Sequence, residues 1–177
     1  MKEPEPADDA AVTKRARRRE QYLSLGLGEL AAAAVFGFVA SFLVTPRFTD
    51  RAATVALWWA LTPLIAILVQ GGCYWLLARE WVGDSPMPRT TATVYSVLRV
   101  VNVALLAAGL AGVLWWWPAD NATALLVFAV WFVGVVEYVN YFQKRLSYPM
   151  HRWFATVGQW RTPQLVRDLR SARPGHS

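Results

Sequence analysis

Four long hydrophobic stretches constrain this chain more than any other feature of its sequence. They cover residues 22–44, 54–78, 91–117 and 121–144. A helix needs about 20 predominantly apolar residues to cross the hydrocarbon core of a bilayer, and each stretch meets that length with residues to spare for tilt. The sequence therefore predicts an all-α integral membrane protein whose residues 22–144 form a four-transmembrane-helix bundle.

The composition leaves little room for a soluble catalytic domain. The four stretches take up more than half of the 177 residues, and only 17% of all residues are charged, against about 25% in soluble domains. The chain has one cysteine, Cys73, and two histidines, His151 and His176. These are too few for an internal disulfide or a multi-ligand metal site. The sequence also lacks the HExxH, GxSxG, P-loop and CxxC patterns. We therefore expect no cofactor and no metal.

The positions of Lys and Arg predict how the chain crosses the membrane. Fifteen of the eighteen lie in the two terminal segments or in the loop 79–90, Arg47 and Arg51 lie on the other side, and Arg99 lies inside a stretch. Cytoplasmic loops carry the excess of Lys and Arg, so both termini are expected in the cytoplasm (N-in/C-in). The ratio of fifteen Arg to three Lys suggests a GC-rich bacterial genome. We therefore expect a multi-pass protein of the plasma membrane.

The terminal segments differ in character from the four stretches. Residues 1–21 are acidic and then basic, and we expect this cytoplasmic N-terminus to be disordered up to about residue 13. The basic run 14–19 directly precedes a span, so it is interpreted as a topology anchor that attracts anionic lipid. It is not interpreted as a nucleic-acid patch, and no nucleic acid is expected as a partner. Residues 145–177 are expected to form a basic cytoplasmic tail with a short amphipathic helical segment.

A polar or charged residue occurs at a similar depth in each stretch. These residues are Glu29, Gln70, Arg99 and Glu137, with Asn102 and Asn140 each within one turn of this level. At about 1.5 Å of rise per residue, this polar layer lies roughly 12 Å from the cytoplasmic boundary. Helical spacing places Tyr95, Arg99 and Asn102 on one face, and Glu137, Asn140 and Tyr141 on another.

Charges at this depth are expected to find partners. A lone charge at the centre of a membrane costs about 2.5–3.5 kcal/mol on insertion scales. Arg99 offers a planar fork that two carboxylates can share, so we expect a Glu29–Arg99–Glu137 cluster in which Gln70, Asn102 and Asn140 complete the hydrogen bonds. Such a cluster could be a structural clamp, a proton or ion relay, a pocket for an anionic headgroup, or a catalytic acid–base pair.

Small residues recur every four positions in two of the stretches. Ala33 and Gly37 share a face with Glu29, and the third stretch carries a similar row. That row is Ala104, Ala108 and Gly112. Rows of this kind let membrane helices approach closely, so these residues are expected to pack against neighbouring helices.

Three functions are compatible with the sequence. The leading hypothesis is a non-catalytic protein that acts through assembly, either as a homo-oligomer or with a larger membrane partner. The second is permeation or transport of protons, ions or a small solute through the polar layer. The third is a membrane enzyme that acts on a lipid headgroup, with Glu29 or Glu137 as a base and Arg99 holding phosphate.

Overall fold

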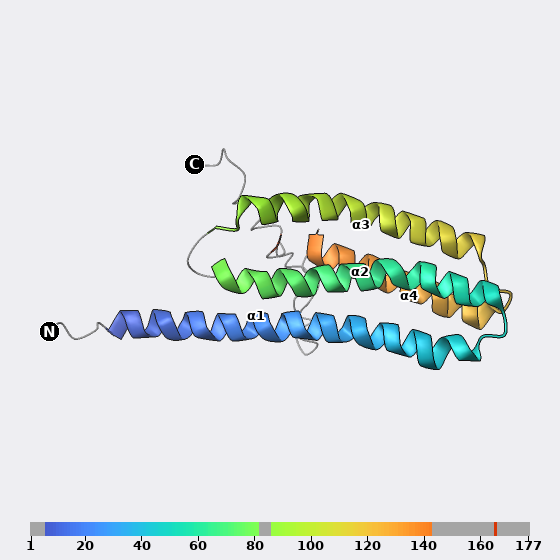
Figure 1. Ribbon diagram of the computed structural model, residues 1–177, viewed down its shortest axis with the longest axis horizontal. Helices are drawn as coiled ribbons and strands as arrows, with labels where there is room; N and C mark the ends of the chain where they lie inside the picture. The colour runs from blue at the N-terminus through green and yellow to red at the C-terminus, as the bar shows by residue number, and fades with distance from the viewer. Residues whose placement is uncertain (1–5, 82–85, 143–164, 166–177) are drawn as a thin grey trace, which may run out of the picture.

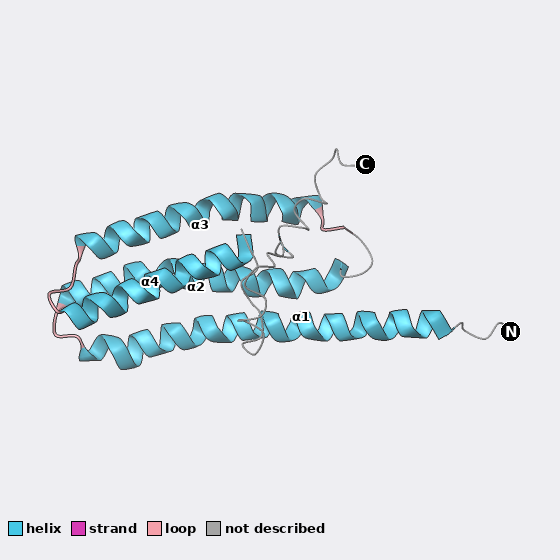
Figure 2. Cartoon of the chain, turned by 180° about the vertical axis from the view of Figure 1, so that it is seen from behind, coloured by secondary structure: helices cyan, strands magenta, loops and turns pink. Residues whose placement is uncertain are grey.

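The described part of the chain is entirely helical. The computed structural model describes residues 6–81, 86–142 and 165 (Figures 1 and 2). These residues form four long α-helices, with short π and 3-10 turns after the first, and they contain no strand. The elements are α1 (Pro6–Phe38), η1 (Val39–Val44), η2 (Thr45–Arg47), α2 (Arg51–Trp81), α3 (Arg89–Trp115) and α4 (Asn121–Phe142).

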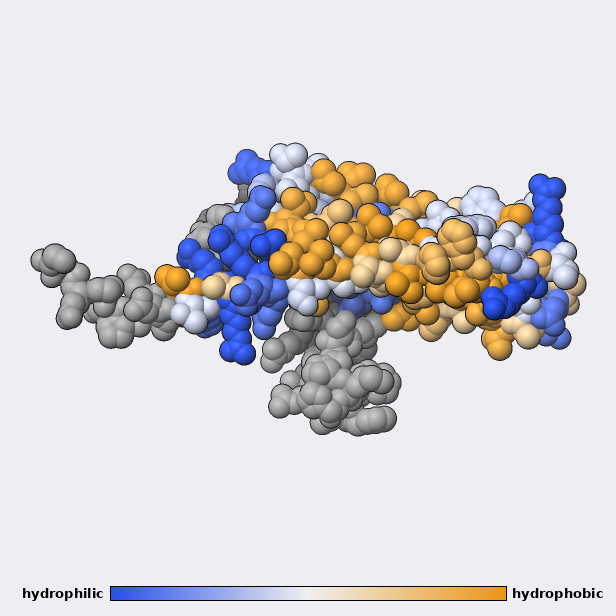
Figure 3. Space-filling model, turned by 60° about the horizontal axis from the view of Figure 1, so that its bottom comes forward, coloured by the Kyte–Doolittle hydropathy of each residue, from blue (hydrophilic) through white to orange (hydrophobic). Residues whose placement is uncertain are grey.

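Four helical segments are long and apolar enough to cross a membrane, which confirms the prediction of four spans. They are Val12–Arg47, Arg51–Trp81, Arg89–Trp115 and Asn121–Phe142. Figure 3 shows a hydrophobic belt between two more hydrophilic ends. Helices satisfy their own backbone hydrogen bonds, so such segments can lie in hydrocarbon. The architecture is that of a multi-pass membrane protein.

The two ends of the molecule differ in charge. The start of α1, the end of α2 and the start of α3 lie at one end (Figure 1). We call this the basic end because Lys14, Arg15, Arg79 and Arg89 lie near it. The connections 45–50 and 116–120 lie at the other end, which we call the short-loop end.

Helix α2 is the scaffold of the molecule. It packs against α1, α3 and α4, whereas α3 and α4 contact one another less extensively. Half of the apolar window of α2 is buried, but only 11% of the corresponding window of α1. The core around α2 contains Leu57, Leu61, Leu64 and Leu68. The other three helices therefore keep broad apolar faces turned outward, as expected of a chain in lipid.

Aspartates begin two of the helices. The Asp50 carboxylate accepts a hydrogen bond from the Ala52 backbone N–H at 2.8 Å, and Asp120 accepts one from the Thr123 N–H at 2.8 Å. Such capping satisfies backbone donors that the first turn leaves free. The Thr123 N–H lowers the pKa of the exposed Asp120 carboxyl. The turns at the short-loop end are thus fixed by local hydrogen bonds.

The termini differ from the sequence expectation or lie outside the described residues. Helix α1 begins at Pro6 and so includes most of the segment that was expected to be disordered. Proline is favoured at the first helical position, and the alanines that follow favour helix. The predicted tail, 145–177, lies outside the described residues except for Leu165. Leu165 is buried in an apolar cluster with Trp81, Met87 and Phe142.

Glycines bring α1 and α2 into backbone contact. A Cβ added at Gly26 would lie 2.8 Å from Leu76 Cγ and 3.0 Å from the carbonyl oxygen of Gly72. A Cβ added at Gly72 would lie 2.8 Å from Leu30 Cγ and 3.0 Å from the carbonyl oxygen of Gly26. Neither position has room for a side chain, so this contact fixes the separation of the two helices.

The predicted packing rows are formed only in part. Ala33 is buried against α2, and Gly37 lies close to Ile65. In α3, Gly112 packs against Trp59, but Ala104 and Ala108 are exposed. The inward face of α3 instead follows the residues Asn102, Leu106, Gly109 and Val113. A step of four residues turns a helix by about 40° beyond a full circle, so the predicted row drifts to the outer side.

The contact between Gly26 and Gly72 predicts a difference between two alanine substitutions in α1. Gly26→Ala should destabilise the protein by about 1–3 kcal/mol, because the new methyl group meets a backbone oxygen as well as a side chain. Gly28→Ala is the matched control, because a Cβ there meets nothing within 4 Å. It should be neutral or stabilising, since alanine favours helix over glycine. Thermal unfolding in detergent measures both, and equal losses would contradict the predicted contact.

Candidate functional site

A reciprocal pair of amides lies at the centre of the polar layer. The Gln70 Nε2 group donates to Asn102 Oδ1 at 3.2 Å, and the Asn102 Nδ2 group donates to Gln70 Oε1 at 2.7 Å. The Asn102 side chain is fully buried between the helices. The Tyr95 hydroxyl donates to the backbone oxygen of Gln70 at 3.0 Å. Together, these three bonds fix the register between α2 and α3.

Tyr141 of α4 forms a second set of contacts, which reaches α2 and α1. A Cβ at Gly71 would lie 2.6 Å from the Tyr141 ring, so the glycine makes room for the ring against α2. The Trp75 Nε1 group donates to the Tyr141 hydroxyl at 3.3 Å. The Tyr141 hydroxyl is in turn hydrogen-bonded to the Glu29 carboxyl. Residues of three helices thus meet at one depth through a single tyrosine.

Glu137 lies near Glu29 on the adjoining helix. Its carboxyl is hydrogen-bonded to Asn140 and is close enough to Glu29 for the two to interact electrostatically. Both carboxyls line a cavity of about 370 Å³. We call this cavity the acidic groove. Its other lining residues are Ser24, Leu25, Gly28, Ala32 and Phe36 of α1, Leu64 and Leu68 of α2, and Val133 of α4.

Arg99 does not join the two carboxylates, so the predicted Glu29–Arg99–Glu137 cluster is not formed in the single chain. Arg99 is exposed on α3, and α3 contributes no residue to the acidic groove. No described residue forms an ion pair with its guanidinium. Helical spacing correctly placed Arg99 near the level of Asn102. It did not show that Arg99 lies outside the groove that holds the two acids.

The other predicted residues of the polar layer form two separate groups: Gln70 and Asn102 bond to each other and to neither carboxyl, whereas Asn140 bonds to Glu137, which lies near Glu29. Glu29, Gln70, Asn102, Glu137 and Asn140 all take part in the contacts described above. Helical spacing put Tyr141 on the stripe of Glu137, but its partners Gly71 and Trp75 were not predicted from the sequence. One sequence feature could have indicated this contact: Gly71 directly follows the polar residue Gln70 in an otherwise apolar stretch.

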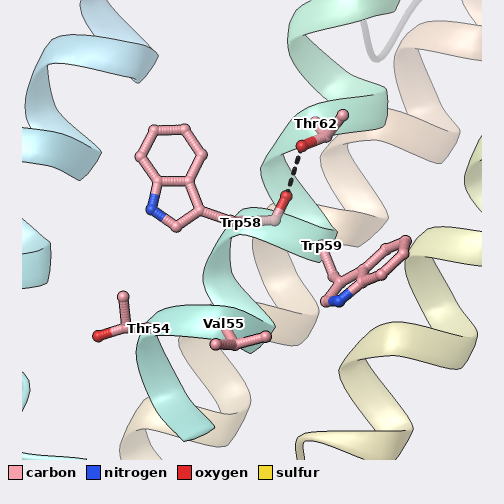
Figure 4. Close-up of a pocket in the computed structure, with 5 residues that line it drawn as sticks. All are labelled: Thr54, Val55, Trp58, Trp59 and Thr62. Atoms are coloured by element: carbon pink, nitrogen blue, oxygen red, sulfur yellow. Dashed lines mark hydrogen bonds between the residues drawn. The ribbon is translucent and has the colours of Figure 1, made fainter. Parts of the chain in front are cut away.

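A second cavity lies at the short-loop end of α2 (Figure 4). It has a volume of about 390 Å³ and is lined by Thr54, Val55, Trp58, Trp59 and Thr62. The two indole rings project to opposite sides of α2, and the Thr62 hydroxyl donates to the Trp58 carbonyl at 2.7 Å. No charged side chain lines it. Tryptophan is enriched at the boundary between lipid and water, which is sufficient to explain this cluster.

The chemistry of the site is therefore that of two carboxyls in a groove with a hydrogen-bonded tyrosine, and a separate exposed arginine. Among the described residues, no group of three or more His, Cys, Asp or Glu side chains could hold a metal ion. No protein-family model matches the chain, and no curated protein or solved structure matches it either.

The amide pair predicts a measurable coupling between α2 and α3. Asn102→Leu and Gln70→Leu should each lower stability by about 1–3 kcal/mol, because each leaves the other amide without its partner. The double variant should lose less than the sum, with a coupling of about 0.6–2 kcal/mol. Ser96→Ala is the control, because its hydroxyl bonds only within α3. Strict additivity in a chemical unfolding assay would contradict the pairing.

Proposed function

We propose that this protein is a non-catalytic membrane protein that acts through assembly with itself or with a larger membrane partner. One observation carries the proposal. Arg99 is exposed in the middle of an apolar span, apart from the two carboxyls of the acidic groove. A charge exposed to hydrocarbon is costly, and a second polypeptide that brings an opposite charge would remove that cost.

The same proposal includes the orientation of the chain. The basic end carries Arg17, Arg18 and Arg19 on exposed turns of α1, and Arg89 at the start of α3. Of the described residues, Arg47 and Arg51 are the basic ones at the short-loop end. By the positive-inside rule the basic end is cytoplasmic, with both termini on that side of the plasma membrane of a bacterial cell. Anionic lipid would bind there with about 1 kcal/mol per basic residue near the surface.

Assembly predicts a particle larger than one chain. The full-length protein, extracted in a mild detergent and measured by light scattering coupled to size exclusion, should have a protein mass at least twice that of the 19.8 kDa chain. If the chain assembles with another membrane protein, the extra mass will be a second polypeptide in the same peak. A monodisperse single chain, both in detergent and in lipid nanodiscs, contradicts the proposal.

Permeation of protons or cations is a second candidate, and the acidic groove favours it. Glu29 and Glu137 line the same cavity, and the hydroxyl of Tyr141 bonds to one of them. Carboxyl chains of this type occur in proton relays of membrane proteins. An enzyme that acts on a lipid headgroup has less support, since the arginine that would hold phosphate lies apart from both potential bases.

The permeation hypothesis predicts a flux that depends on Glu137. Liposomes containing the protein should dissipate a pH gradient or a cation gradient faster than empty liposomes, and Glu137→Gln should remove most of the difference. Glu80→Gln is the control, because Glu80 is exposed near the basic end, outside the groove. A rate equal to that of empty liposomes excludes permeation and leaves assembly as the leading candidate.

A further inference from the structure

Arg99 lies on the side of α3 that faces α4. Leu106, two turns later, contacts α4: its carbonyl oxygen accepts a hydrogen bond from Trp131 Nε1 at 2.9 Å, and its Cδ2 lies 3.4 Å from a Cβ added at Gly134. Residues seven apart share a face of a helix. Arg99 therefore shares the face of Leu106, although its own side chain is exposed.

The register between α3 and α4 sets the depth of Arg99. The two helices run in opposite directions, so a step of seven residues back from Leu106 corresponds to seven residues forward from Gly134. This places Arg99 level with Tyr141, the tyrosine that is hydrogen-bonded to Glu29. Glu137 lies one turn away, or about 6 Å along the axis, which is within the reach of an arginine side chain.

Arg99 and the acidic groove therefore lie on different sides of α4 and at about the same depth along it. The groove lies between α4 and α1, whereas the spacing from Leu106 puts Arg99 on the side of α3 that is turned toward α4. The outward face of α4 between these two features is exposed and apolar. It includes Leu125, Ala129 and Phe132.

We propose that a second copy of this chain packs against the outward face of α4, with a two-fold axis parallel to the helices. Arg99 of each copy then reaches Glu29 and Glu137 in the groove of the other. This proposal rests on the proposed function and specifies its partner and its interface. The contact is isologous, so one arrangement forms two equivalent ion-pair clusters. An arginine fork can bind two carboxylates at once.

Charge complementarity favours a second copy over the other possible occupants. Identical chains inserted in the same orientation bring Arg99 and the groove to the same depth without further adjustment. A lipid phosphate could neutralise Arg99, but it would bring no cation to Glu29 and Glu137. Ala129 adds a small residue at the centre of the face, where two helices must approach closely.

Cysteine cross-linking in native membranes tests the geometry. In a Cys73→Ser background, which removes the single native thiol, Ala129→Cys should form an intermolecular disulfide under mild oxidation. The matched control is Ala108→Cys, an exposed alanine of α3 that lies away from the proposed interface. It should cross-link at least about tenfold less. Equal yields, or a higher yield at residue 108, overturn the proposed interface.

Charge reversal tests the ion pair between chains. Arg99→Glu and Glu137→Arg should each reduce the cross-linking of Ala129→Cys by about tenfold or more, because like charges would then meet. When the two variants are co-expressed with different tags, the mixed dimer regains opposite charges at both contacts. It should therefore copurify in preference to either homodimer. If Arg99→Glu does not fold, the milder variant Arg99→Gln replaces it. Thermal unfolding checks that this variant is folded.

The outcomes separate this inference from the proposed function. Cross-linking at residue 129 with preferential mixed dimers supports the inference. If the particle is larger than one chain but neither charge reversal changes the cross-linking, the inference is wrong and the proposal of assembly is retained. Loss of cross-linking without recovery in the mixed dimer also overturns it, since the charges would then be neutralised by lipid or within one chain. A monomer in the membrane overturns both proposals.

Discussion

The high cost of an unpaired charge in hydrocarbon is the constraint on which the account of this protein depends. Three acidic or basic side chains, those of Glu29, Arg99 and Glu137, lie in the apolar interior of the spans, away from their ends. Two of them share a groove and the third is exposed elsewhere. Neutral polar groups differ from the charged ones: Gln70 and Asn102 each donate one hydrogen bond to the other within the chain. The single chain thus pairs its amides but leaves Arg99 apart from the two carboxyls, and this difference is the basis of the proposed assembly.

The scaffold that holds this arrangement is built from small residues of α2 and their neighbours. Gly72 permits contact with Gly26 of α1, and Gly71 admits the ring of Tyr141 from α4. At the other end, a Cβ at Gly109 would lie 2.8 Å from the Trp59 carbonyl oxygen. That carbonyl is the one that Pro63, four residues later, cannot bond. The helices of this molecule therefore approach one another most closely at glycines. The contacts of the polar layer require this close approach.

Much of the fold follows from the sequence because long apolar stretches have few alternatives in a bilayer. The four spans and the common depth of Glu29, Gln70 and Asn102 were predicted from length and spacing alone. The separation of Arg99 from the two acids was not predicted. Spacing indicates the depth and the approximate face of a residue, but it does not indicate which helices are neighbours. The central position of α2 depends on contacts such as Gly71 with Tyr141, which involve residues distant in the sequence. Ala104 and Ala108 show the same limit, because an outward row and an inward row have identical spacing.

The central claim is that the guanidinium of Arg99 meets carboxylates of another chain. Solid-state NMR on a mixed sample tests it most directly. One pool of protein carries ¹⁵N-arginine and the other ¹³C-glutamate, and the two are combined in detergent and reconstituted into bilayers. The account predicts magnetisation transfer between the arginine and glutamate side chains, which can arise only between chains and which disappears in Arg99→Gln. Absence of transfer in the mixed sample, with transfer in uniformly labelled protein diluted to single chains, would contradict it.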